Sequence, residues 1–174
     1  AVPANGATPV NDKFAAATVI GGSSNVVVGS NVGATAEAGE PDHVGNPVSR
    51  SVWWVWKSPF TGTVRVSTEG STFDTELAVY TGTSVSNLVL VAADDDSAYA
   101  NTSRLFLRAY KGETFRIAVD GFMGATGDIQ LSVAPAGLPA PIWAIVDVFG
   151  SPLQSAAFSN SVVLVDFWET ICTG

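Results

Sequence analysis

A run of three aspartates at positions 94–96 is the feature of this sequence best suited to chemistry. Ca²⁺ takes six to eight oxygen ligands, and carboxylates gathered on a loop can supply several of them. We expect Asp74, which lies in another loop-like stretch, to join Asp94, Asp95 and Asp96 in a calcium site. The other carboxylates expected at loops or strand ends, and therefore able to converge there, are Glu37, Glu40, Asp42 and Asp120.

The competing interpretation of the aspartate run is a solvated acidic turn. Aspartate side chains accept hydrogen bonds from the backbone of the turn in which they lie. The spacing is not that of an EF-hand loop, which alternates Asp or Asn and places Glu at its twelfth position. Calcium is therefore the one cofactor that the sequence predicts, and a turn without metal stays open as the alternative.

Three tryptophans at positions 53, 54 and 56 form the second candidate group. Alternation along a strand places Trp54 and Trp56 on one face and Trp53 on the other. We expect Trp54 and Trp56 in the core, because each can bury a large apolar area. Trp53 is then the surface candidate, where it would stack on a polysaccharide or contact a protein ligand.

The single histidine, His43, follows Glu40-Pro41-Asp42 in a loop-like stretch. A catalytic triad needs a nucleophile and an orienting acid, and the chain has no G-x-S-x-G elbow. It also lacks the H-E-x-x-H, Walker A and G-x-G-x-x-G patterns. We therefore expect His43 to be a structural residue that makes hydrogen bonds.

Composition restricts the classes of partner. The chain has 174 residues, with 8 Lys and Arg against 16 Asp and Glu, and a formal net charge of −8. Scattered cations on an acidic chain argue against nucleic acid and against an anionic membrane surface, since both require clustered Lys and Arg. No stretch reaches the roughly 18–20 apolar residues of a membrane span. Few lysines and an acidic balance favour an exported bacterial protein.

Polar and apolar residues alternate through most of the first 134 residues. The pattern at residues 63–67, 114–119 and 128–133 is typical of half-buried strands. Glycine-rich turns separate these stretches, with no amphipathic helix between them, which predicts an all-β, antiparallel sandwich. The other strands are expected at residues 25–28, 51–56, 76–80, 88–92 and 104–108, with a short helical turn at 13–17.

A proline-rich stretch at residues 135–141 changes this pattern and predicts a stiff linker. Beyond it, residues 142–148 and 161–168 are apolar runs. The second run is typical of a strand buried on both faces of a parallel or mixed sheet. We therefore expect a β-sandwich at 1–134, the linker at 135–141 and a second segment at 142–174.

The first part of the chain carries a set of motifs in a recurring order. They are Asn11-Asp12-Lys13-Phe14-Ala15, Glu40-Pro41-Asp42-His43, residues 51–56, residues 73–82, the aspartates at 94–96 and residues 117–121. With them, about residues 11–134 resemble the bacterial pre-peptidase C-terminal (PPC-like) domain. The resemblance implies a jelly-roll β-sandwich. It also implies a non-catalytic accessory module of a secreted, cell-surface or periplasmic bacterial protein, attached to other domains of a larger chain.

The second segment ends in Cys172-Thr173-Gly174 after an apolar run. Together with residues 143–153, Phe158 and residues 162–171, it is similar to the start of a thioredoxin-like domain of the redoxin type. Such a domain continues into a C-x-x-C motif, which implies that Cys172 is catalytic in an intact parent domain. We expect residues 142–174 to be an incomplete α/β domain. Because Cys172 is the only cysteine, this chain is not expected to cycle between dithiol and disulfide.

The leading expectation is a non-catalytic adhesion or ligand-binding module of an exported bacterial protein. Two alternatives stay open. One is a thiol–disulfide oxidoreductase, or redoxin, carried by the second segment. The other is a structural subunit that forms homo-oligomers by β-strand addition, because an apolar strand at residues 162–167 with unpaired backbone groups would pair with a strand edge of another copy.

Overall fold

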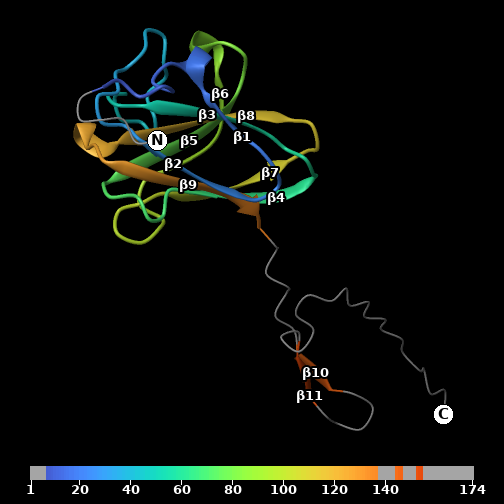
Figure 1. Ribbon diagram of the computed structural model, residues 1–174. Helices are drawn as coiled ribbons and strands as arrows, with labels where there is room; N and C mark the ends of the chain where they lie inside the picture. The colour runs from blue at the N-terminus through green and yellow to red at the C-terminus, as the bar shows by residue number, and fades with distance from the viewer. Residues whose placement is uncertain (1–6, 137–143, 147–151, 155–174) are drawn as a thin grey trace, which may run out of the picture. The chain divides into compact units, whose positions relative to one another are not determined.

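The computed structural model describes residues 7–136, 144–146 and 152–154. Two β-sheets lie face to face in the first part of the chain (Figure 1). Sheet A has the strand order β1-β3-β8-β5-β6, and sheet B has the order β2-β9-β4-β7. The strands are β1 (Thr18–Ile20), β2 (Asn25–Ser30), β3 (Val52–Lys57), β4 (Gly62–Ser67), β5 (Thr75–Thr81), β6 (Val89–Asp94), β7 (Arg104–Ala109), β8 (Thr114–Gly121) and β9 (Asp128–Pro135).

Alternating apolar side chains fill the space between the two sheets. Val64 and Val66 of β4 point inward from sheet B, and Trp54 and Trp56 of β3 point inward from sheet A. Both tryptophans are almost fully buried, as alternation predicts. The expected all-β, two-sheet sandwich is therefore confirmed, and each strand expected between residues 25 and 133 is present with its ends shifted by a residue or two.

One strand pair departs from the expected antiparallel arrangement. β1 pairs with β3 in parallel, with Thr18 opposite Trp54 and Ile20 opposite Trp56. Only Ile20 of this three-residue strand is buried. So short a strand leaves no alternating pattern in the sequence, which is why it was not predicted. After it, the chain turns through Gly22, whose φ of +82° favours glycine, and crosses to sheet B.

The outer face of sheet A is covered by two loop segments, residues 11–17 and 37–51, which we call the covering loops. The 3₁₀ turn η1 (Phe14–Ala16), close to the expected helical turn at 13–17, places Phe14 against Trp53. The two ring centroids are 5.4 Å apart, and the planes meet at 78°. Phe14 and Trp53 form a second apolar cluster with Ala78, Tyr80 and Ala118. The other 3₁₀ turns are η2 (Val85–Asn87) and η3 (Phe122–Gly124).

The chain divides into two units, Ala1–Ala136 and Gly137–Gly174. β9 runs to Pro135, which lies opposite Val64 in the sheet, so the first residue of the expected linker belongs to a strand. In the second unit, β10 (Ala144–Val146) pairs antiparallel with β11 (Pro152–Gln154). The apolar strand expected at 162–167 and Cys172 lie outside the described residues. Within the described ranges, no helix is long and apolar enough to cross a membrane.

Candidate metal centre

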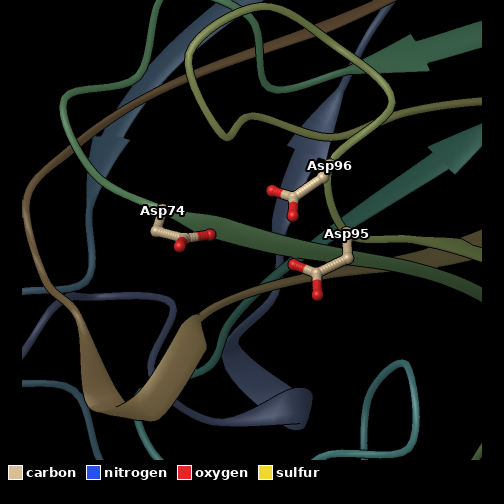
Figure 2. A group of neighbouring side chains, drawn as sticks. All are labelled: Asp74, Asp95 and Asp96. Atoms are coloured by element: carbon tan, nitrogen blue, oxygen red, sulfur yellow. The ribbon is translucent and has the colours of Figure 1, made fainter.

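Three of the four aspartates expected to bind calcium lie together. Asp74 directly precedes β5, and Asp95 and Asp96 directly follow β6. Because β5 and β6 pair antiparallel, with Leu77 opposite Asp94, the start of one strand lies beside the end of the other. One carboxylate oxygen from each of the three residues lies within 4.8 Å of the other two (Figure 2). Oxygens on opposite sides of a Ca²⁺ ion are about 4.6–5.2 Å apart, so one ion can contact all three.

Two oxygens of this acidic group are buried without a hydrogen-bond partner in the described part of the chain, Oδ1 of Asp74 and Oδ1 of Asp95. The other oxygen of Asp74, Oδ2, accepts a long hydrogen bond of 3.5 Å from Asn101 Nδ2. Burial, followed by the charges of Asp96, Asp74 and Asp94, raises the pKa of Asp95. A carboxylate oxygen that has lost water and gained no donor is one that a cation would stabilise.

Asp94, the fourth expected ligand, is outside the group. Its Oδ2 accepts hydrogen bonds from the amides of Ser97 (3.0 Å) and Arg104 (2.7 Å). Its Oδ1 accepts one from the Ser97 hydroxyl. Asp94 therefore stabilises the turn, which is the role that the acidic-turn interpretation predicted for all three aspartates. The aspartate run thus contains both a turn residue and two candidate ligands.

Further negative charge is buried nearby in sheet A. Glu76 and Asp120 are directly opposite each other on β5 and β8, and both are buried. Asp120 accepts hydrogen bonds from the amides of Ser49, Arg50 and Gly121. Burial raises the pKa of Glu76, and the charges of Asp120 and Asp95 add to this. The acidic group therefore lies beside other carboxylates, and a bound cation would lower their mutual repulsion.

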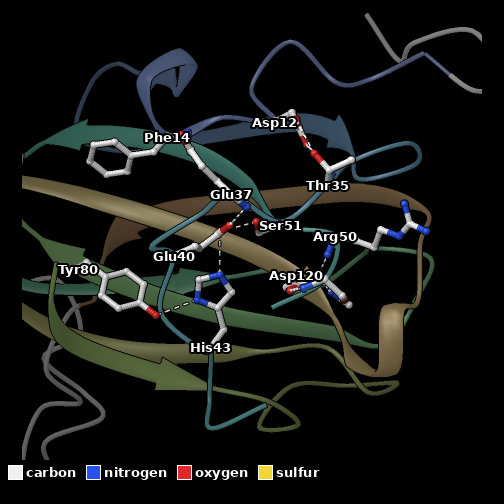
Figure 3. A network of polar contacts seen from close by, with 12 residues as sticks. Asp12, Phe14, Thr35, Glu37, Glu40, His43, Arg50, Ser51, Tyr80 and Asp120 are labelled. Carbon is white, nitrogen blue, oxygen red and sulfur yellow. Dashed lines mark hydrogen bonds and ion pairs between the residues drawn. The ribbon is translucent and has the colours of Figure 1, made fainter. Parts of the chain in front are cut away.

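The other acidic residues expected to converge on this site belong elsewhere. Asp42 is exposed. Glu37 and Glu40 join a polar network beneath the covering loops, in which Glu40 Oε2 accepts the amide of Glu37 at 2.8 Å (Figure 3). Glu40 Oε1 lies 3.3 Å from His43 Nε2 and accepts the hydroxyl of Ser51. Nothing in the spacing of these residues indicated that they would meet.

His43 has the structural role that its isolation in the sequence predicted. It is completely buried, and its Nδ1 lies 2.8 Å from the Tyr80 hydroxyl. Burial pushes the pKa of Glu40 upward, but hydrogen bonds from His43, Ser51 and the Glu37 amide outweigh it and lower that pKa. The contacts join the covering loops to β5, so this network holds the loops on sheet A.

The expectation of an exposed Trp53 is wrong. Trp53 is 0% exposed, packed between Phe14, His43 and Tyr80. Alternation correctly placed it on the face opposite Trp54, but that face is covered by loops rather than by water. Trp53 therefore cannot stack on a ligand in this structure. It belongs to the apolar cluster between sheet A and the covering loops.

The fold and the acidic group together define an all-β, two-sheet sandwich with a carboxylate cluster at one end of sheet A. No family model and no curated protein matches the chain. Among solved structures, the chain is similar to the pre-peptidase C-terminal domain of the collagenase from Bacillus anthracis, with 18% identity and a TM-score of 0.44. That similarity covers 67% of this chain and 93% of the other.

Proposed function

We propose that the β-sandwich is a non-catalytic binding module of an exported bacterial protein, stabilised by Ca²⁺ at Asp74, Asp95 and Asp96. The observation that carries the metal site is the pair of buried carboxylate oxygens, one on Asp74 and one on Asp95, that have no hydrogen-bond partner among the described residues. The motifs shared with PPC-like domains support the role of an accessory module. Three carboxylates supply part of the six to eight oxygens that Ca²⁺ requires, and water would supply others.

Calcium is expected to raise the melting temperature of the protein relative to EDTA. At a free concentration of about 100 Kd, binding to the folded state alone stabilises by about 2.7 kcal/mol. Asp95→Asn is expected to abolish this response, because it removes the charge of a half-buried ligand whose Oδ1 has no other partner among the described residues. Asp128→Asn is the matched control, since Asp128 is an exposed aspartate outside the group. Identical melting curves of the unaltered protein in Ca²⁺ and in EDTA would contradict the metal site.

Without metal, the free energy of unfolding of the unaltered protein, measured relative to that of Asp95→Asn at the same pH, is expected to fall as the pH rises. The folded-state pKa of Asp95 is raised from its ordinary value of 3.8, so the folded protein binds this proton more tightly than the unfolded chain does. The resulting stability is present at low pH and is lost as the pH rises through the raised pKa. Thermal melts in EDTA between about pH 4 and pH 7 would measure the difference. A constant gap between the two proteins across this range would refute the argument.

A redox role for residues 142–174 and self-association through residues 162–167 stay predictions. Both depend on the resemblance to redoxins or on the apolar run, and both concern residues outside those described, Cys172 included. The β10–β11 pair lies within the segment that resembles a redoxin. Two paired strands of three residues each occur in many folds, so the pair does not support a redox role. The calcium-stabilised module is therefore the function that the described geometry supports best.

A further inference from the structure

Half of the chain's 8 lysines and arginines gather on or beside two neighbouring strands of sheet B. Arg65 lies on β4, Arg104 and Arg108 lie on β7, and Lys111 lies in the turn after β7. The ion pairs in the described part of the chain are Lys13–Asp12 and His43–Glu40, so none of these four cations is paired. On a chain with a net charge of −8, this is a local group of cations without ion pairs among the described residues. The expectation of scattered cations is wrong here.

Aromatic residues alternate with these cations along β7. Leu105, Leu107 and Ala109 are buried between the sheets, so the intervening residues face solvent. Phe106 is 57% exposed, and Tyr110, just after the strand, is 60% exposed. The Arg108 guanidinium lies 5.8 Å from the centroid of the Tyr110 ring.

The register across to β4 completes this surface. It places Arg65 opposite Phe106, and Thr63 opposite Arg108. The outer face of β4 and β7 therefore presents a positively charged surface with two exposed rings.

β7 is also the edge of sheet B. In an antiparallel strand, successive residues turn their N–H and C=O groups to opposite sides. Ser103, just before β7, accepts a hydrogen bond from the Thr68 amide, so it faces β4. The amide of Arg104 faces away and binds Asp94, and the amide of Tyr110 binds Glu113.

Between these two ends, the outward backbone groups of β7 make no hydrogen bond among the described residues, and β6 approaches this edge at its Arg104 end, where Asp94 binds. Phe106 and Arg108 belong to the same outward-facing series as Arg104 and Tyr110. No hydrogen bond among the described residues uses their amides or carbonyls. The two ends of this edge already bind carboxylates of the chain itself, and its middle presents free donors and acceptors beside unpaired arginines.

We propose that β7 binds an extended acidic peptide of a partner protein, which adds to sheet B as a further strand. Outward backbone groups along β7 recur every two residues, about 6.6–6.8 Å, which is the repeat of another extended peptide. Acidic side chains of that peptide would lie beside Arg104 and Arg108, and an apolar one between them beside Phe106, while Arg65 adds positive charge from the other side of β7. A peptide uses both the charges and the open backbone edge, whereas an acidic polysaccharide or a nucleic acid would use the charges alone.

A fluorescein-labelled peptide, Thr-Glu-Thr-Val-Thr-Glu-Thr, which places two Glu and the Val on one face, tests the proposal by fluorescence anisotropy. We expect saturable binding that weakens as salt is added. The single variant Arg108→Glu should lower the affinity by about tenfold or more. Lys57→Glu is the matched control, because Lys57 is an exposed cation of sheet A, and it should leave the affinity close to that of the unaltered protein. An equal loss in the control would show that only the net charge matters and would overturn the site.

The backbone contribution has its own readouts. Hydrogen exchange at the Phe106 and Arg108 amides should slow when the peptide binds, and alternate N-methylation of the peptide should remove binding while keeping its charge. Phe106→Pro should also remove binding without breaking the pairing with β4, since the Phe106 amide faces away from that strand. Phe106→Ala keeps the amide and should still bind. Equal binding of the N-methylated peptide, or tighter binding of polygalacturonate or polyuridylate, would overturn strand addition.

Discussion

Replacement of Trp53 by alanine is expected to lower the free energy of unfolding by about 3–5 kcal/mol, the range for a buried large aromatic side chain. Trp53 is fully buried and contacts the rings of Phe14, His43 and Tyr80. Its removal would leave a cavity between sheet A and the covering loops. The same substitution at Trp54, in the core between the sheets, should have a similar cost.

Urea unfolding of the variants would measure these costs. Tyr99→Ala is the control, because Tyr99 is 83% exposed and its loss should change stability by no more than about 0.5 kcal/mol. A cost at Trp53 as small as that at Tyr99 would mean that the covering loops do not close over sheet A in solution. A large cost at Trp54 alone would lead to the same conclusion.

Glu40→Ala is the second substitution with a large expected effect, again about 3–5 kcal/mol. The Glu40 carboxylate accepts hydrogen bonds from the Glu37 amide and the Ser51 hydroxyl and lies 3.3 Å from His43 Nε2. Alanine would leave these partners in a buried setting with no acceptor, and each unpaired group costs about 1–3 kcal/mol. Glu69→Ala, at an exposed glutamate, is the matched control and should be close to neutral.

The pH dependence of this effect has a definite sign. The pKa of Glu40 is lowered in the folded protein, so the stability it contributes is present above its ordinary value of 4.5. That stability is lost as the pH falls through the lowered pKa. The deficit of Glu40→Ala should therefore be largest near neutral pH and should shrink in acid. A deficit that grows on acidification would show that the carboxylate is not the stabilising form.

Strand positions could be predicted from the sequence because most strands of the sandwich bury one face. Residues 63–67 and 128–133 alternate for this reason, and both are strands. β1 could not be predicted, since three residues with one buried side chain do not establish a period. The outer layer was missed for a related reason. A periodic pattern separates the two faces of β3, but it does not tell whether water or a loop covers the second face.

The candidate site was predicted in part. Adjacent aspartates are visible in a sequence, and a turn between paired strands brings Asp74 to Asp95 and Asp96. Asp94 is not part of the site because its carboxylate binds the backbone amides of Ser97 and Arg104, and the sequence does not show that these amides would lie within reach. Alternation of Arg104, Phe106 and Arg108 was visible too, but its meaning required knowing that β7 is an edge strand and that Arg65 lies beside it.

The unequal covering of the two sheets has a consequence for how the molecule opens. Sheet A is packed on both faces, by the core on one side and by the covering loops on the other, and all but one residue of β5 is buried. Sheet B has one solvent-facing side, on which every second residue of β2 and β7 is exposed or partly exposed. Partial unfolding costs least where the fewest apolar contacts are lost. Partial unfolding should therefore begin with the separation of sheet B from an intact sheet A, so the group of Asp74, Asp95 and Asp96 should keep its structure at temperatures at which β7 has already detached.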